Sequence, residues 1–438
     1  MPLAKIDDFL FLQFGVYFDG EDEYEAVYLS LSQDTLNVLM LIGRQGPISR
    51  AGIARQLNFT ASRITRLTEA LIAVRLVHET GFEKSTGGRR GCLLALSEDT
   101  HLLCGVRISI SSTIEVVLTD LHANILAQEV FQADSSALPE QITAQIHVAL
   151  KQCLAKGENF SQRLIAVGLG VSGLVNPAEG KMLRSRSFPH WKNVPLAPML
   201  ADALGLPVFL ENEITMTTSA ELWFGNGRGC QNFLFVGLGA GVRMGMVIDG
   251  RLYRGSTGNA GELGHTTFRK KGPICHCGNS GCVECYVSTN RLLAWGREAL
   301  QSYSDSLLAD FCNRKADALT LGHIIQAAER GDRLALTLFR RVCQPAGQSI
   351  AALINIFDTQ KILVGGGLAA AGRLLLDLLE EEIAVHAFPL LRSTTTLEIA
   401  HFLEHGAVIG GGALILEKIC SGDLKISGAR SAELTAFQ

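Results

Sequence analysis

Apolar residues recur three or four positions apart in three consecutive segments near the N-terminus, residues 32–46, 49–59 and 61–77. This spacing places the apolar side chains on one face of a helix, so each segment is predicted to be an amphipathic helix. Ser49 and Thr60 directly precede the second and third apolar stripes, where a hydroxyl can cap the first turn. Two short helices joined by a tight turn are typical of a helix-turn-helix.

Residues 77–97 follow as two predicted strands around a glycine- and arginine-rich turn, which is the pattern of a wing. In a helix-turn-helix the second helix enters the major groove, and we expect the wing to reach phosphates or the minor groove. The predicted DNA contacts are therefore small, hydroxyl-bearing or basic residues in these segments: Ser49, Arg50, Thr60, Ala61, Ser62, Arg63, Thr65, Arg66, Arg89 and Arg90.

From about His101 onward, strands alternate with helices, and several strands end in glycine-rich turns. The predicted fold class is α/β, with an N-terminal winged helix-turn-helix followed by a two-lobed α/β body that has a cleft between its lobes. The segments that carry this prediction are residues 102–126, 164–175, 207–225, 232–255 and 362–383.

A chain of 438 residues is too long for one core, so several domains are expected. Residues 1–30 are predicted to be an acidic N-terminal extension. Residues 31–97 form the winged helix-turn-helix, and residues 98–438 form the body. We expect the winged helix to have its own hydrophobic core.

Charge is unevenly distributed over these parts. Residues 1–30 hold one Lys and seven acids, a net charge of −6, whereas residues 44–91 hold nine Lys or Arg and three Glu, a net charge of +6. The whole chain carries −4. A basic block on an acidic protein favours contact with nucleic acid, because phosphate contacts supply most non-specific affinity. Charge alone would favour a solvated helix face, and the helix-turn-helix pattern tips the balance toward nucleic acid.

The composition, with 47% hydrophobic and 19% charged residues, is that of a soluble globular protein. No apolar run reaches the ~18 residues of a membrane span, and the N-terminus lacks the basic start of a signal peptide. The sequence therefore predicts a cytoplasmic protein without membrane insertion. In that reducing environment, clustered cysteines indicate metal ligands or redox groups rather than disulfides.

Four of the 11 cysteines lie between positions 275 and 285. Their Cys-x-Cys-x4-Cys spacing differs from the Cys-x-x-Cys of a dithiol redox site, and glycines in the loop allow three sulfurs to face one point. A structural zinc ion takes four nitrogen or sulfur ligands in a tetrahedron. Cys275, Cys277 and Cys282 supply three, and the residue pattern leaves His265, Cys285 or His276 as the fourth. Reduced cysteines without a metal are the alternative, which the density of the cluster makes the weaker hypothesis.

The order of motifs resembles the ROK family (repressors, open reading frames and sugar kinases), and within it the winged-helix repressors of the Mlc and NagC type. The resemblance covers roughly residues 33–420 and rests on "GNAGELGH", "CHCGNSGCVE", "GLGAGVRMG", "ENE" before a helix, and "LVGGGL". It implies an actin/hexokinase-like body. It also implies one structural Zn²⁺ per chain in the loop 265–284, held by His265, Cys275, Cys277 and Cys282, with Cys285 as a bystander.

The same resemblance implies an effector site in the cleft, formed by Gly173, Asn212, Glu213, Glu262, His265 and Glu284. Carboxylates held beside a zinc-pinned loop suit the vicinal hydroxyls of a sugar, although any one of them alone would also suit a solvated surface. The effector is a sugar, a sugar phosphate or a sugar-transporter domain. The other expected partners are double-stranded operator DNA and further copies of the chain, in a homodimer or homotetramer.

Kinases of the family carry an Asp-x-Gly-Gly-Thr turn and a catalytic Asp in Glu-Asn-Asp. Here Arg107 replaces the first Asp, Ser109 and Ile110 replace the glycines, and Glu213 replaces the catalytic Asp. Displacement of a proton acceptor by one methylene is costly for proton transfer. The sequence thus favours a non-enzymatic transcriptional regulator, a repressor of sugar uptake or metabolism genes with a degenerate kinase body. The alternative is an ATP-dependent ROK sugar kinase with an added DNA-binding domain. A scaffold that contacts only proteins is disfavoured by the basic recognition helix and wing.

Overall fold

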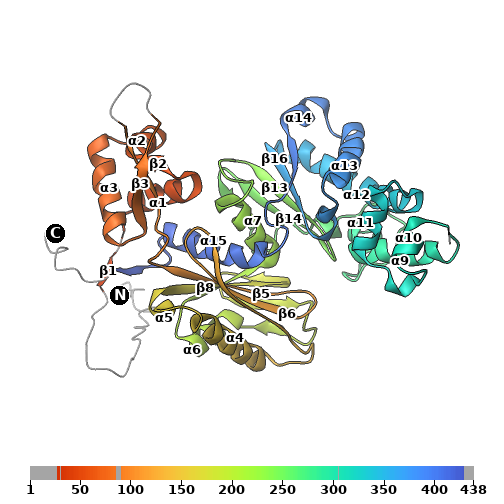
Figure 1. Cartoon of the computed structure of the whole chain (residues 1–438), viewed down its shortest axis with the longest axis horizontal. Helices are drawn as coiled ribbons and strands as arrows, with labels where there is room; N and C mark the ends of the chain where they lie inside the picture. The colour runs from red at the N-terminus through yellow and green to blue at the C-terminus, as the bar shows by residue number, and fades with distance from the viewer. Residues whose placement is uncertain (1–26, 30, 85–89, 304, 429–438) are drawn as a thin grey trace, which may run out of the picture.

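The computed structural model describes residues 27–29, 31–84, 90–303 and 305–428 (Figure 1). Most of the predicted acidic extension, residues 1–26 and residue 30, lies outside the described residues. Its remaining part is strand β1 (Val27–Leu29), which pairs antiparallel with β18 (Ile426–Gly428). The N-terminal and C-terminal strands of the described chain are therefore joined in one small sheet.

The three predicted N-terminal helices are confirmed, and each begins at a side-chain cap. Hydroxyl groups of Ser32, Ser49 and Thr60 accept hydrogen bonds from the first turns. The predicted wing strands are also present, and an unpredicted two-residue strand, β2, completes a sheet of order β2-β4-β3. The elements are α1 (Gln33–Gln45), β2 (Ile48–Ser49), α2 (Arg50–Leu57), α3 (Ala61–Ala73), β3 (Val77–Phe82) and β4 (Cys92–Leu96).

Lobe 1 of the body contains a five-stranded sheet of order β12-β8-β5-β6-β7, with α4 to α6 on one side (Figure 1). Strands β5, β8 and β12 are parallel, and β6 and β7 are antiparallel to their neighbours. The elements of lobe 1 are β5 (Leu102–Ile108), β6 (Thr113–Thr119), β7 (Ile125–Gln132), α4 (Pro139–Leu154), α5 (Phe160–Arg163), β8 (Leu164–Val171), β9 (Gly173–Asn176), β10 (Lys181–Ser185), β11 (Lys192–Val194), α6 (Leu196–Leu204) and β12 (Val208–Asn212).

Lobe 2 repeats the topology of lobe 1. Its sheet has the order β15-β14-β13-β16-β17, again with three parallel strands and two antiparallel ones. The elements are β13 (Phe233–Leu238), β14 (Val242–Ile248), β15 (Arg251–Leu252), η1 (Leu263–His265), α8 (Glu284–Val287), α9 (Thr289–Leu300), α10 (Leu307–Phe311), η2 (Ala316–Ala318), α11 (Leu321–Glu329), α12 (Arg333–Phe357), β16 (Lys361–Gly365), η3 (Gly367–Ala371), α13 (Gly372–His386), α14 (Pro389–Thr394) and β17 (Thr396–Ile399).

Two helices lie between the sheets and connect the lobes. Helix α7 (Glu213–Trp223) follows the last strand of lobe 1 and packs on β14 of lobe 2, whereas α15 (Gly406–Cys420) follows lobe 2 and packs on β5 and β8 of lobe 1. The two helices also pack on each other (Figure 1). Their contact needs glycine at Gly410, because an added Cβ would lie 1.9 Å from the carbonyl oxygen of Met216. This arrangement is the predicted two-lobed body.

The winged helix-turn-helix does not have the separate core that we expected. One continuous apolar cluster joins Ile42 and Leu39 of α1 to Trp223 of α7 and Ile419 of α15. An added Cβ on Gly43 would lie 2.5 Å from the Trp223 ring, so the absence of a side chain at this position of α1 is what permits the contact. The sequence prediction failed here because the apolar stripe of α1 does not reveal which partner covers it.

Candidate functional site

A cavity of about 650 Å³ lies between the two lobes. The ends of β5, β13 and β16 line it together with the first residues of α7 and the residues that precede α15. Parallel α/β sheets place their ligand sites at the carboxyl ends of the strands, and the cavity occupies that position for both lobes. It is therefore the candidate effector site.

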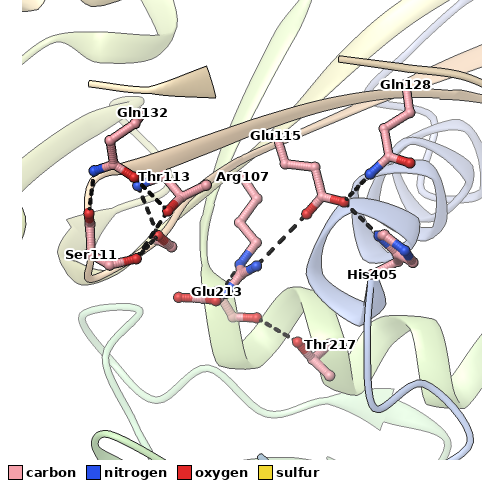
Figure 2. Close-up of polar contacts among 10 residues, drawn as sticks. Arg107, Ser111, Thr113, Glu115, Gln128, Gln132, Glu213, Thr217 and His405 are labelled. Carbon is pink, nitrogen blue, oxygen red and sulfur yellow. Dashed lines mark hydrogen bonds and ion pairs between the residues drawn. The ribbon is translucent and has the colours of Figure 1, made fainter. Parts of the chain in front are cut away.

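Arg107, from β5, crosses the cavity wall to an acidic residue of α7 (Figure 2). Its Nε lies 2.6 Å from Oε1 of Glu213, and its Nη1 lies 3.7 Å from Oε2 of Glu115. Burial disfavours the charge on Arg107, but the two carboxylates outweigh that effect and raise its pKa. Two of the four positions at which the chain departs from the kinase motif, Arg107 and Glu213, are therefore joined as an ion pair.

The Arg107 pair belongs to a larger polar network (Figure 2). Glu115 is buried, accepts a hydrogen bond of 2.8 Å from Gln128 Nε2, and lies 2.5 Å from Nδ1 of His405 at the start of α15. In a separate group, Ser111 of the β5–β6 turn and Thr113, the first residue of β6, are hydrogen-bonded to each other and to Gln132. Ser109 and Ile110, which replace the glycines of the kinase motif, lie in the same turn, and Ser109 Oγ is 3.0 Å from Ser111 Oγ. Glu115 and His405 were not predicted, because only the fold brings their distant positions together.

The remaining predicted effector carboxylates are also paired with arginines. Glu262 lies 3.1 Å from Arg243, and the buried Glu284 lies 3.6 Å from Arg186 while it accepts a hydrogen bond from the backbone of Val242. Both arginines line the cavity. Each predicted effector carboxylate is therefore held beside a guanidinium group at the cleft. Arg186 was not predicted, and no motif in the sequence marks it.

The structure brings the six predicted effector residues to one region but not to one surface. Asn212 and Glu213 line the cavity, and the Asn212 side chain donates a hydrogen bond of 2.6 Å to the carbonyl of Gly173. Glu262 and Glu284 are not among the residues that line the cavity, although each pairs with an arginine that does. His265 lies 3.7 Å from Glu262 and belongs at the same time to the cysteine cluster. The effector region and the cysteine loop therefore share one residue.

The cysteine loop places four potential metal ligands around one point. The ligand atoms of His265, Cys275, Cys277 and Cys282 all lie within 4.8 Å of one another. Cys275 Sγ is 3.6 Å from His265 Nδ1, and Cys277 Sγ is 3.7 Å from Cys282 Sγ. Tetrahedral zinc, with Zn–S near 2.3 Å and Zn–N near 2.05 Å, separates its ligand atoms by about 3.6–3.8 Å. The distances fit a metal site of this kind.

The two other candidates for the fourth position fit less well. Cys285 is not among the four clustered residues, and burial raises the pKa of its thiol to about 11. His276 is exposed, lies 3.7 Å from Cys275 Sγ, and forms a second group with His265 and Glu284. Only His265 is close to all three cysteine sulfurs as well as partly buried, so the geometry favours the ligand set that the family resemblance implies.

The predicted DNA-binding residues fall into three groups. Thr60, Ala61, Ser62, Arg63, Thr65 and Arg66 are exposed at the start of α3, and Arg90 is exposed after the wing turn. Arg89 lies outside the described residues. Ser49 is only 1% exposed, caps α2 and donates to Glu83, while Arg50 is bonded to Thr68 and Glu79. The exposed face of α3 is thus formed mostly by residues that the sequence predicted.

Arg63 is held by two neighbours on this face. Its guanidinium group pairs with Asp34 of α1 and stacks over Phe59, 4.2 Å from the ring centre. The side chain of Arg66, one turn along, forms no hydrogen bond or ion pair with any residue in the described ranges. Within the same ranges, no helix combines the length and apolar character needed to cross a membrane.

The model of the ROK family matches residues 105–418. The chain is 30% identical over 412 residues to the DNA-binding transcriptional dual regulator NagC of Escherichia coli strain K12, covering 92% of this chain and 97% of the relative. It is 27% identical over 374 residues to the xylose repressor of Caldicellulosiruptor bescii, covering 85% and 93%. Both alignments are longer than the segment that the family model matches.

Solved structures of ROK family proteins also resemble this chain. A ROK family transcriptional regulator, a homologue of the E. coli Mlc protein, superposes with a TM-score of 0.75 at 27% identity, covering 89% of this chain and 96% of that one. A ROK family glucokinase from Streptomyces griseus, solved with glucose and AMPPNP, superposes with a TM-score of 0.63 at 27% identity. It covers 72% of this chain and 98% of its own length. The kinase therefore matches the body, and the regulator matches most of the whole chain.

Proposed function

This chain belongs to the ROK family, and from that premise we propose that it is a DNA-binding transcriptional repressor of genes for sugar uptake or metabolism. The proposal rests on two features that occur together in this chain. An exposed, partly basic recognition helix stands on a kinase-like body, and in that body the Arg107–Glu213 ion pair occupies the positions of two kinase acids. The relatives of similar length and domain order are named as regulators and repressors.

We propose that α3 enters the major groove of double-stranded operator DNA. Its exposed Ser62, Thr65 and Arg66 are suited to contact bases and phosphates, and Arg90 of the wing would add a phosphate contact. Arg63 would exchange its Asp34 partner for a phosphate. Ser49 and Arg50 then have a supporting role, because their side chains hold α2 to the wing. Operators of this class are commonly palindromic, so we propose that residues 31–97 act within a homodimer or homotetramer.

The effector is proposed to bind in the cavity between the lobes and to change the affinity for DNA. Asn212 and Glu213 at the cavity, together with the nearby Glu262 and Glu284, offer acceptors for sugar hydroxyls, and the three paired arginines hold these carboxylates in place. The relatives named as N-acetylglucosamine and xylose repressors support a sugar or a sugar phosphate. Control by a sugar-transporter domain docking on the body is the other mode that the family resemblance implies. Both modes suit a cytoplasmic protein.

We propose that the cysteine loop holds one structural Zn²⁺ through His265, Cys275, Cys277 and Cys282. With all four positions filled by protein ligands, the ion would have no open coordination site and would serve to fix the loop. Residues of the loop also connect the proposed metal site to the effector region. His265 connects the metal cluster to Glu262, and Glu284 begins α8 two residues after the last cysteine ligand.

The proposed regulator is not an enzyme, although the body is shared with sugar kinases. A general base must be free to accept the proton of the attacking hydroxyl. Glu213 is instead held in an ion pair with Arg107 at 2.6 Å, so its Oε1 already accepts a hydrogen bond from the guanidinium group. Ser109 and Ile110 also place side chains in the β5–β6 turn, where glycines would leave space for phosphates. Phosphoryl transfer to a sugar remains the alternative function.

Selection of duplex DNA by the full chain from a random library tests the proposal. We expect one palindromic sequence to be enriched, and its affinity should fall steeply with salt. The matched control is the full chain with Arg66→Ala. A truncated chain of residues 96–438 is unsuitable as a control, because the removed segment shares an apolar core with the body. A parallel assay with ATP and a panel of hexoses, pentoses and amino sugars should give no phosphorylation above background. Failure to enrich any sequence, together with robust phosphorylation that Glu213→Gln abolishes, would favour the kinase.

A further inference from the structure

The winged helix-turn-helix is attached to both lobes of the body. On lobe 1, His122 Nε2 lies 2.7 Å from the carbonyl oxygen of Leu96, and His101 Nε2 lies 3.2 Å from that of Val74. On the other side, helix α1 packs against the C-terminal ends of both α7 and α15. Rotation of one lobe against the other must therefore change at least one of these attachments.

The contact between α1 and the end of α7 combines close packing with several hydrogen bonds. Trp223, the last residue of α7, is fully buried against Gly43 of α1, whose added Cβ would lie 2.5 Å from the indole ring. Arg44 stacks over the same ring at 5.0 Å and donates a hydrogen bond to the carbonyl of Gly250 in lobe 2. Arg228 donates to the carbonyls of Arg44 and Gly46 at 3.0 Å each. The end of α1 is thus held to α7 and lobe 2 by close packing and by hydrogen bonds.

The opposite ends of the same two helices begin at the cavity. Glu213 is the first residue of α7 and pairs with Arg107 of lobe 1, and His405 directly precedes α15 and contacts Glu115 of lobe 1. Helices α7 and α15 are packed closely enough that Gly410 admits no side chain, so a shift of either helix is not absorbed by loose packing. Each helix therefore has one end at the cavity and the other end at α1 (Figure 1).

We infer that the contact of Trp223 with Gly43 and Arg44 couples the opening of the cleft to the placement of α3. Trp223 is on this view a positioning residue for DNA binding, and it touches neither effector nor DNA. The inference rests on the proposed function and adds how the two sites communicate. A ligand that pulls Arg107 and Glu213 apart or together would displace α7 relative to α15, and α1 would tilt with the end of α7. Because coupling between binding sites is reciprocal, operator binding must in turn alter the cavity.

The reciprocal effect provides a test that needs no knowledge of the effector. Hydrogen exchange of the full chain is measured with and without the selected operator duplex, and the segments to follow are residues 107–115 and 402–408 at the cavity. Coupling of this kind corresponds to factors of about 5 to 150, so exchange in these segments should change about fivefold or more on DNA binding. No change in the wild-type chain that binds its operator would overturn the inference and leave the proposed function standing.

Two variants identify the route. Arg228→Met removes the exposed guanidinium group that holds Arg44 and Gly46, and Gly43→Ala forces α1 away from Trp223. We expect both to bind operator with the response at the cavity reduced at least threefold, and Arg228→Met remains informative where Gly43→Ala does not fold. Gly52→Ala is the matched control, since its Cβ would meet only Ile48 and Ser49 within the module. A full response in Arg228→Met would exclude the α1–Trp223 route. A wild-type chain that binds no operator would overturn the proposed function and this inference with it.

Discussion

The cysteine loop and the cleft both gather reactive side chains, but they do so in opposite ways. The four clustered residues of the loop lie between positions 265 and 282, and backbone turns within that segment bring them together. The cleft network draws Arg107, Glu115, Glu213 and His405 from four elements in both halves of the body. A local cluster depends on its own loop, whereas a distributed one depends on the whole fold. Perturbing the two should therefore have different consequences.

Removal of a metal ligand should have the largest effect. We expect Cys282→Ala to lose the zinc and to lower the melting temperature of the full chain by more than about 10 °C, because structural zinc contributes directly to folding. Operator binding should also be lost, since α1 shares its core with the body. Elemental analysis and thermal unfolding measure both effects. Cys285→Ala is the control and should retain zinc; a variant His265→Ala with full zinc would show that the ligand set is wrong.

Breaking the cleft pair should have a smaller effect that spares the metal. Arg107→Met leaves the Glu115 and Glu213 carboxylates without their shared cation. The side chain of Arg107 is 34% exposed, so solvent screens the interaction and we expect a loss of about 1 kcal/mol in the free energy of unfolding. Chemical denaturation measures it, with Glu213→Gln and the double variant completing a cycle. Strict additivity of the two single changes would mean that the pair contributes nothing to stability.

Changes on the exposed face of α3 should leave the body intact. Arg66→Ala should weaken operator binding about fivefold to tenfold at physiological salt and reduce the salt dependence by about one phosphate contact. Fluorescence anisotropy at several salt concentrations measures both quantities. Arg314→Ala, on the surface of lobe 2, is the control of equal charge. Equal losses in the two variants would indicate a general charge effect and no specific contact.

The smallest expected effect concerns Asp34. Its carboxylate competes with DNA for Arg63, so Asp34→Asn should strengthen operator binding about twofold to threefold. The gain should vanish when Arg63 is already replaced by Ala, and the same anisotropy assay compares the single and double variants. Weaker binding by Asp34→Asn would mean that Asp34 orients Arg63 for DNA and does not compete with it.

The success of the sequence prediction follows the same division between local and distributed features. Caps at Ser49 and Thr60, the wing strands and the spacing of the cysteines are local signals, and the corresponding elements are present. The separate core expected for the winged helix is absent, because periodicity identifies an apolar face without identifying its partner. Arg186 and His405 reach the cavity only through tertiary packing, so no spacing along the chain could have marked them. The replacement of kinase residues by Arg107 and Glu213 could be read from the sequence, but the ion pair between them could not.

The Arg107–Glu213 pair also bears on how such a protein changes during evolution. The kinase motif has acids at both of these positions, and glycines where this chain has Ser109 and Ile110. Changing Arg107 to Asp first would place a third carboxylate beside Glu115 and Glu213, while changing Glu213 to Asp first would lengthen the gap to the guanidinium group and still leave the base neutralised. Each single change would thus lower stability or leave the guanidinium group beside the carboxylate, so neither change alone would restore the kinase motif. The pair thereby links the two positions, and we expect substitutions there to be tolerated best when they occur together.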